Sequence, residues 1–320
     1  MDFNFKTLLE FNDYFKDEKT CYEFFESQRW ADGVPVCPHC GTEKKPYKVK
    51  SRSKFRDIPS YRCSERPCDL PFTVRTKSIF EGSKVELRLW FQAIYEITTS
   101  KKGISSIELA TRLGVTQKTA WFMNHRIRTM LSEIEPQLLN GIVEGDESYF
   151  GGKNKNRHKD KKVENSQGRS AKDKTPVVGL IERGGRVVTF VTKNTEAEIL
   201  HEIIEDNVHE DATLVTDAYR GYCGIGKRYN HVTVKHEDGG YVKLEGDTKF
   251  HTQNIENFWS QLKRGYIGIY HYMSPKHLHR YCDEFATRYN LRDVSNIKRF
   301  LHVLQISTTT RITYDKLTGE

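Results

Sequence analysis

The sequence contains no run of about 18 consecutive apolar residues, the length that a membrane-spanning helix needs. Its start, MDFNFKTLLEFNDYF, also lacks the basic and then apolar layout of a secretory signal peptide. These two absences predict a cytoplasmic protein with no membrane partner. Because disulfides are rare in a reducing compartment, the seven cysteines indicate metal ligation or free thiols.

Acidic residues are too few to balance the basic ones. The chain has 51 Lys and Arg against 43 Asp and Glu, which gives a formal net charge of +8. The excess is concentrated in residues 41–66 and 150–175, each of which contains nine basic and three acidic residues. This balance favours a polyanionic partner, and both segments are candidate phosphate-contacting surfaces. With 320 residues, of which 37% are hydrophobic, the chain is long enough for two or three folded domains.

Four of the cysteines are grouped in two pairs. Cys37 and Cys40 stand in the motif Cys-Pro-His-Cys-Gly, and Cys63 and Cys68 follow about 20 residues later. Two such pairs predict a zinc ribbon, in which two tight turns direct four thiolates at one structural Zn²⁺ ion. The second pair is separated by Ser-Glu-Arg-Pro, longer than the usual gap of about two residues, so this turn must bulge. His39 is an alternative ligand, and unligated thiols are the alternative to a metal site.

Helix-like periodicity is found on both sides of the cysteine pairs. Residues 1–30 predict a helical lead-in, in which Cys21 is expected to be a buried thiol rather than a ligand. Residues 83–136 predict three helices, the last two separated by the short turn from Gly114 to Thr116. This arrangement is typical of a helix-turn-helix, whose last helix reads DNA; an ordinary helical hairpin is the alternative. The candidate DNA-binding residues are Gln117, Lys118, Thr119, Asn124, Arg126 and Arg128.

The pattern changes to short strands after Pro136. Strands are expected at 142–149, 177–181, 187–192 and 213–216, with a helix over 196–208. This order is typical of an RNase H-like domain, a mixed sheet flanked by helices. The basic insertion at 150–175 interrupts the first hairpin and has almost no apolar residues, so its basic side chains are expected to contact backbone phosphates. These side chains are Lys153, Lys155, Arg157, Lys159, Lys161 and Lys162.

A helical stretch over 251–264 completes a set of acidic residues. It has one apolar stripe, with Glu256 and Lys263 two turns apart at its edge. Asp146 lies on the first expected strand and Asp217 directly follows the last one. Two neighbouring strands and a helix that packs on them can bring three carboxylates to two Mg²⁺ (or Mn²⁺) ions, a site for phosphodiester chemistry. The alternative is an ordinary amphipathic helix with a surface ion pair.

The order of these motifs resembles that of the zinc-ribbon DDE-type insertion-sequence transposases, which are related to the eukaryotic Merlin elements. The resemblance covers nearly the entire chain. It depends on Arg29-Trp30, the Cys-Pro-His-Cys-Gly motif, the helix-turn-helix, Glu-Gly-Asp-Glu-Ser-Tyr-Phe-Gly-Gly from Glu144, Thr-Asp-Ala-Tyr from Thr216, His-Thr-Gln-Asn-Ile-Glu-Asn-Phe-Trp-Ser from His251, and Leu-Lys-Arg-Gly from Leu262.

The resemblance implies a DNA transposase, which is both an endonuclease and a polynucleotidyl transferase. Asp146, Asp217 and Glu256 match the catalytic acids that hold two Mg²⁺ ions in each active site. Lys263 matches a lysine that contacts DNA near the scissile phosphate, with Arg264 beside it. The implied partners are double-stranded DNA, as terminal inverted repeats and as target, and a second copy of the chain in a homodimer. In a prokaryote such a protein is expected at the nucleoid.

The sequence therefore predicts a multidomain α+β protein. The expected domains are a helical lead-in (1–30), a zinc ribbon (31–82), a helix-turn-helix domain (83–136), an RNase H-like catalytic domain (137–300) with its basic insertion (150–175), and a C-terminal tail (301–320).

Several alternatives stay open at this level. Glu144 shares the strand face of Asp146, and Glu147 takes the opposite face, so spacing alone does not decide which acid binds metal. Asn254 is the neighbour to compare with Glu256, because the third acidic position varies in the family. A domesticated zinc-dependent DNA-binding regulator and a structure-specific nuclease without strand transfer are the other functions considered.

Overall fold

The computed structural model describes residues 5–51, 57–132, 137–152, 154–164, 166, 170–235, 242–308 and 312–318. The chain forms two compact units, one made of residues 1–133 and 293–320 and the other of residues 134–292. The sequence predicts a catalytic domain that ends at residue 300 and a tail from 301. In the structure, however, everything from residue 293 onward belongs to the N-terminal unit.

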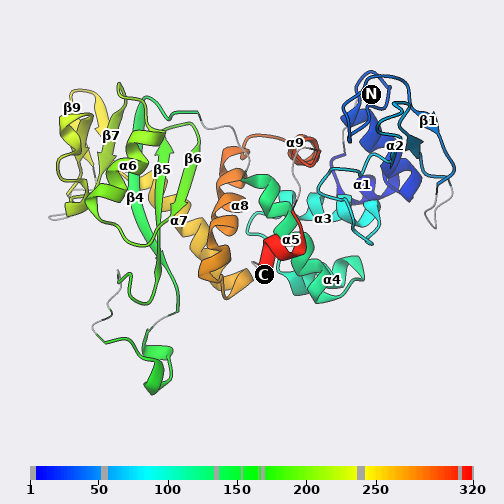
Figure 1. Cartoon of the computed structure of the whole chain (residues 1–320). Helices are drawn as coiled ribbons and strands as arrows, with labels where there is room; N and C mark the ends of the chain where they lie inside the picture. Colours follow the sequence, from blue (N-terminus) through cyan, green and yellow to red (C-terminus); the bar gives the residue numbers. More distant parts are fainter. Residues whose placement is uncertain are drawn as a thin grey trace. The chain divides into compact units, whose positions relative to one another are not determined.

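The N-terminal unit is mainly helical (Figure 1). Its helices are α1 (Leu8–Tyr14), α2 (Glu18–Arg29), α3 (Leu87–Thr99), α4 (Ser106–Leu113), α5 (Gln117–Leu131), α9 (Asn296–Ile306) and α10 (Tyr314–Thr318). Three short strands, β1 (Tyr47–Lys48), β2 (Tyr61–Arg62) and β3 (Pro71–Phe72), form an antiparallel sheet in the order β1-β2-β3.

Aromatic rings explain why α9 belongs to this unit. The ring centroid of Phe300 on α9 lies 5.1 Å from that of Phe11 on α1 and 5.5 Å from that of Phe91 on α3. All three rings are buried, as is Cys21, in agreement with the prediction for this thiol. Burial of such rings contributes about 1.5–3 kcal/mol each, so the last helix completes the core of the lead-in.

Helices α4 and α5 are separated by the turn that the sequence predicts. Gly114 ends α4 with a φ of 66°, a left-handed conformation that glycine adopts without strain. Thr116 then caps α5, because its hydroxyl oxygen accepts a hydrogen bond from the N–H of Thr119 at 3.2 Å. A left-handed stop followed by a threonine cap fixes where the last helix of this group begins.

The second unit is built around a five-stranded mixed sheet in the order β6-β5-β4-β7-β8 (Figure 1). Strands β4, β5 and β6 pair antiparallel, whereas β7 pairs parallel with both β4 and β8. The strands are β4 (Ile142–Phe150), β5 (Thr175–Glu182), β6 (Val187–Val191), β7 (Thr213–Thr216) and β8 (Asn230–Thr233). The first four confirm the strands expected from the sequence, and β8 is an additional edge strand.

Helices and short segments complete this unit. The helices are α6 (Ala197–Asn207), α7 (Gln253–Gly265) and α8 (Leu278–Asn290), and a separate hairpin joins β9 (Lys243–Glu245) to β10 (Thr248–Phe250). Short 3₁₀ segments lie at Asn154–Asn156, Lys159–Lys161, Arg220–Tyr222, Ile225–Lys227 and Pro275–His277, and a π-helical turn lies at Tyr266–Tyr270.

Helices cover both faces of the large sheet. Apolar residues of α7 and α8, among them Ile255, Trp259 and Phe285, pack on one face, and Leu200 and Ile204 of α6 pack on the other. Helix α7 lies so close to β5 that a Cβ atom added at Gly179 would be 2.6 Å from the Trp259 ring. Glycine at this position therefore allows α7 to rest directly on the sheet.

Candidate functional site

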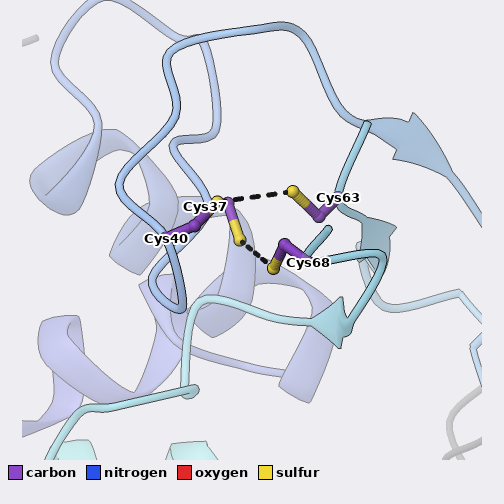
Figure 2. A group of neighbouring side chains, drawn as sticks. All are labelled: Cys37, Cys40, Cys63 and Cys68. Atoms are coloured by element: carbon purple, nitrogen blue, oxygen red, sulfur yellow. Dashed lines mark hydrogen bonds between the residues drawn. The ribbon is translucent and has the colours of Figure 1, made fainter. Parts of the chain in front are cut away.

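The four cysteines of the ribbon bring their sulfur atoms together (Figure 2). The Sγ atoms of Cys37 and Cys68 are 3.8 Å apart, those of Cys40 and Cys63 are 3.6 Å apart, and all four lie within 4.8 Å of one another. A tetrahedral ion with Zn–S bonds of about 2.3 Å has sulfur–sulfur edges of about 3.8 Å. The cluster therefore fits one Zn²⁺ ion, and four thiolates make a structural site because they leave no position open to substrate.

Two turns hold these thiols in place. In the first, the N–H of Gly41 donates to the carbonyl oxygen of Cys37 at 2.8 Å. In the second, the N–H of Cys68 donates to the carbonyl oxygen of Glu65 at 3.0 Å, and the N–H of Glu65 donates to Cys63 Sγ at 3.4 Å. The longer second turn thus bulges, as the sequence predicts, while Cys68 stays within reach of the other three sulfur atoms.

His39 is not part of this group of ligand atoms, and its Nε2 atom lies 3.3 Å from the carbonyl oxygen of Pro71. Its backbone contributes instead. Burial raises the pKa of the Cys37 thiol, but hydrogen bonds from the N–H groups of Cys40 and His39 outweigh burial, so the pKa is lowered. The pKa of the Cys63 thiol is raised instead, chiefly by burial, so a bound cation would be needed to hold the cluster as thiolates.

Loss of one thiolate is expected to remove the metal. The Cys40→Ser protein should bind much less than one zinc per chain, and its N-terminal unit should unfold at a lower temperature, because metal binding supplies folding free energy. Elemental analysis and scanning calorimetry of the full chain, purified without chelator, measure both effects. Cys223→Ser is the matched control, since Cys223 is an exposed thiol outside the cluster. If the protein without any substitution contains no zinc, the assignment is wrong.

The exposed part of α5 is its first turn. Gln117 and Lys118 are exposed, and Thr119 is partly exposed. Gln117 Nε2 donates to Ser106 Oγ at 2.8 Å, and Lys118 Nζ lies 5.7 Å from the ring centroid of Tyr314. The first residues of a recognition helix are those that usually contact base edges, so DNA contact by these three side chains stays a prediction that their exposure allows.

The other predicted DNA-binding residues of α5 are buried. Asn124 Nδ2 donates to the carbonyl oxygen of Ile104 at 3.4 Å. The Arg126 guanidinium lies 5.6 Å from the ring centroid of Trp90, and Arg128 is only 2% exposed. Planar guanidinium groups stack on aromatic rings, so a basic helix can place arginines inside as well as outside. Of the α5 residues predicted to bind DNA, only Gln117, Lys118 and Thr119 are at least partly exposed, so the burial of Asn124, Arg126 and Arg128 corrects the longer list.

The basic insertion between β4 and β5 extends beyond the sheet as an arm (Figure 1). Asn154 closes it on itself, donating from Nδ2 to the carbonyl oxygen of Val163 at 2.7 Å and accepting from the N–H of Val163 at 3.0 Å. Arg157 Nη2 donates to the carbonyl oxygen of Asp173 at 2.9 Å, so it helps to hold the arm. Lys153 lies outside the described residues. The exposed predicted residues of the arm are Lys155, Lys159, Lys161 and Lys162.

Asp146 and Asp217 lie at the same level of two neighbouring inner strands of the large sheet, just beyond the point where these strands pair. Glu144 on β4 pairs with Val215 on β7 in the parallel ladder, and Asp146 and Asp217 each follow two residues later. Both carboxylates are partly exposed. Burial raises the pKa of the Tyr222 hydroxyl well above its usual value, and the charges of Glu147, Asp146 and Asp217 raise it further. Glu147, Asp146 and Asp217 are therefore all close enough to Tyr222 for their charges to act on its hydroxyl.

The acids on β4 point to opposite faces of the sheet. Asp146 pairs with Gly179, whose missing side chain would meet α7, so Asp146 is on the face that α7 covers. Glu144 is on this face too, fully buried, with Asn254 Nδ2 donating to its Oε1 atom at 2.7 Å. Glu147 faces the other side, where it accepts a hydrogen bond from the Tyr222 hydroxyl.

Helix α7 carries the third acid and the lysine. Glu256 is exposed in the first turn, where its Oε1 atom accepts from the Thr252 hydroxyl at 2.9 Å. Lys263 and Arg264 are exposed in the last turn, about 10 Å further along the axis. Within the described residues, the four cysteines are the one group with three or more ligand atoms within 4.8 Å of one another, so the three acids do not form such a group.

Two residues near these acids were not singled out from the sequence. Tyr222 lies in a 3₁₀ turn after β7, and Arg183 lies at the end of β5 with its Nη2 atom 3.1 Å from Glu144 Oε1. Tyr222 follows Asp217 by five residues and Arg183 precedes a Gly-Gly turn, so neither position has a pattern that indicates a role. Only tertiary contact shows that each is a partner of an acid on β4.

Comparison with known proteins identifies the class. Residues 16–69 match the transposase zinc-ribbon domain, and residues 138–290 match the ISXO2-like transposase domain. The chain is also 29% identical over 283 residues to an uncharacterized protein in transposable element ISH50 of Halobacterium salinarum. That alignment covers 86% of this chain and 91% of the Halobacterium protein.

The chain belongs to the insertion-sequence transposases that combine a zinc ribbon with an ISXO2-like transposase domain. The resemblance predicted from its motifs is thereby confirmed. Among the described residues, no helix has both the length and the apolar character that are needed to cross a membrane.

Proposed function

We propose that this protein binds the terminal inverted repeats of its own element and catalyses DNA strand cleavage and strand transfer with two Mg²⁺ (or Mn²⁺) ions. Asp146, Asp217 and Glu256 would hold the ions. The observation that carries the proposal is the position of Asp146 and Asp217, two residues beyond the last paired residues of adjacent parallel strands. Ions bound there would activate the attacking oxygen and stabilise the leaving oxygen of an in-line displacement.

Contacts of the neighbouring acids favour Asp146 as the first ligand. Glu144 is fully buried and already accepts hydrogen bonds from α7, and Glu147 faces the opposite side and binds the Tyr222 hydroxyl. Asp146 is the one of these three acids that is partly exposed on the face covered by α7. Glu256 is exposed on α7, the helix that covers this face, and would supply the third ligand.

A two-ion site does not require all its ligand atoms to meet in one close group. Metal ions in a two-metal site are about 3.5–4 Å apart and Mg–O bonds are about 2.1 Å, so ligands at opposite ends can be about 8 Å apart. A group of atoms within 4.8 Å of one another describes a one-ion site, such as the four thiols. The mixed sheet with helices on both faces supports an RNase H-like arrangement for residues 137–292.

Surfaces other than the acids would bind DNA. The first turn of α5, after the Gly114 stop, would be the start of a recognition helix in a helix-turn-helix. The exposed lysines of the arm lie in a segment with almost no apolar residues, which suits contact with phosphates without base reading. Both kinds of surface are needed to place one phosphodiester bond at the acids. We propose that a homodimer performs this on two element ends.

Strand transfer with the element's own ends tests the proposal. Full-length protein, Mg²⁺ and a duplex that carries one terminal repeat with a free 3′ hydroxyl should yield covalent joints to a target duplex. Joints should be absent with a scrambled repeat or without divalent metal. Cleavage without joints would favour the nuclease, and sequence-specific binding without either reaction would favour the regulator.

A further inference from the structure

Glu144 is a carboxylate with an unusual number of partners for a fully buried group. Its Oε1 atom accepts from Arg183 Nη2 at 3.1 Å and from Asn254 Nδ2 at 2.7 Å. Its Oε2 atom accepts from the backbone N–H groups of Asn254 at 2.9 Å and Ile255 at 3.2 Å. Four hydrogen bonds thus satisfy a side chain that is 0% exposed.

These bonds make Glu144 the cap of helix α7. The residue before α7, Thr252, gives no side-chain cap to the helix, and its hydroxyl donates instead to Glu256. Glu144 replaces the missing local cap from a strand 110 residues away in the chain. A negative charge at a helix N-terminus is favourable, because the first N–H groups have no partner within the helix.

Arg183 extends this connection to the segment that leads into α7. Its Nη1 atom donates to the carbonyl oxygen of Lys249 at 2.6 Å, and its Nη2 atom donates to that of His251 at 3.4 Å. The guanidinium therefore binds Glu144 and the chain just before the helix at once. The start of α7 is fixed to β4 by polar contacts as well as by the apolar packing of Ile255.

We propose that Glu144 is a positioning residue for the metal site. It fixes the first turn of α7 against β4, and thereby sets Glu256 relative to Asp146, which lies two residues along the same strand. This inference rests on the proposed function. A buried carboxylate costs free energy unless it is fully paired, and an apolar residue would pack at least as well in this layer. The directional hydrogen bonds of Glu144 fix the position of Glu256 relative to Asp146. Apolar packing alone does not fix this position.

A change in metal dependence is the expected signature. The Glu144→Gln protein keeps the shape of the side chain but loses the charge that faces Arg183 and the helix N-terminus. Single-turnover cleavage at low Mg²⁺ should fall by roughly 10–100-fold, as is typical for partners of metal ligands. Higher Mg²⁺, or Mn²⁺, should restore most of the rate, and DNA affinity should stay within about twofold. The Mg²⁺ concentration that gives half of the maximal cleavage rate, the Mg²⁺ midpoint, should therefore rise. Arg183→Met should raise this midpoint too.

Three comparisons separate this role from the others. Val143→Ala is the control for a destabilised strand, because Val143 is buried on β4 but packs on the opposite face. Glu144→Gln and Arg183→Met could lower the melting temperature and yet have the same Mg²⁺ midpoint as Val143→Ala. In that case the positioning role is wrong. If Glu144→Gln shows no cleavage at any Mg²⁺ concentration while Asp146→Asn cleaves, Glu144 is itself a ligand. Cleavage by Asp146→Asn together with an unchanged Glu144→Gln midpoint would reject the proposed site as a whole.

Discussion

The Asp146→Asn and Asp217→Asn proteins are expected to bind the element's ends normally and to cleave them slower by about 10³-fold or more. Each change removes one negative charge from the sheet edge at nearly constant volume, so the fold should be unaffected. Metal ions in such sites stabilise the transition state by several kcal/mol, and about 1.4 kcal/mol corresponds to tenfold in rate. Single-turnover cleavage at saturating DNA measures the effect without interference from binding.

Asp211→Asn is the matched control for this experiment. Asp211 precedes β7 and its side chain is 88% exposed, so it lies on the same segment as Asp217 but at the opposite end of the strand. Its cleavage rate should equal that of the unchanged protein. Near-normal cleavage by Asp146→Asn combined with an inactive Glu147→Gln protein would place the metal site on the face where Tyr222 lies, in contradiction to the assignment.

Periodicity was a good guide to the second unit because its elements are regular. The runs 142–149 and 177–181 alternate or are wholly apolar, and the structure forms β4 and β5 there. Strand β8 has the sequence Asn-His-Val-Thr, and Val232 is its only buried side chain. No hydrophobic pattern therefore predicts this strand. Strand β8 forms by pairing with the free side of β7. This pairing depends on the rest of the sheet and cannot be predicted from the local sequence.

Long-range contacts account for the rest of the differences. Residues 293–320 follow the second unit in the chain, yet Phe300 fills an aromatic core that begins at Phe11. The sequence predicts a tail from residue 301 and no helix at Asn296–Ile306, so both α9 and its contact with α1 were missed. The same limit applies to α5. Arg126 is of a residue type that often binds DNA, but its guanidinium lies over the Trp90 ring. Residue type alone does not distinguish a guanidinium in a core from one on a surface.

The sequence proposes the members of the candidate site but does not divide their roles. Strand alternation shows that Glu144 and Asp146 share a face, and it leaves both as possible metal ligands. What separates them is the position of Asn254, which bonds Glu144 from a helix that starts 110 residues later. A sequence pattern along one strand does not contain that contact.

The arm and Lys263 should affect different steps of the reaction. Replacing Lys155, Lys159, Lys161 and Lys162 with Gln should reduce the slope of log affinity against log salt by roughly three to four units, since each duplex phosphate neutralised contributes about 0.9. These side chains are exposed, and the side-chain hydrogen bonds of Asn154 and Arg157 that hold the segment do not involve them. Once DNA is saturating, the cleavage rate of this variant should be close to normal.

Lys263→Ala should do the reverse. One exposed lysine contributes at most about one unit to the salt slope, so affinity between 50 and 300 mM salt should change little. Lys263 lies on α7 at the opposite end from Glu256, on a helix that packs directly on the sheet, where it can contact a phosphate close to the one being cut. Loss of such a charge costs on the order of 10²-fold in rate. Gln261→Ala, an exposed change in the same turn of α7, is the control for the helix itself. If Lys263→Ala cleaves as fast as Gln261→Ala at saturating DNA, α7 supports the acids but does not bind the scissile strand.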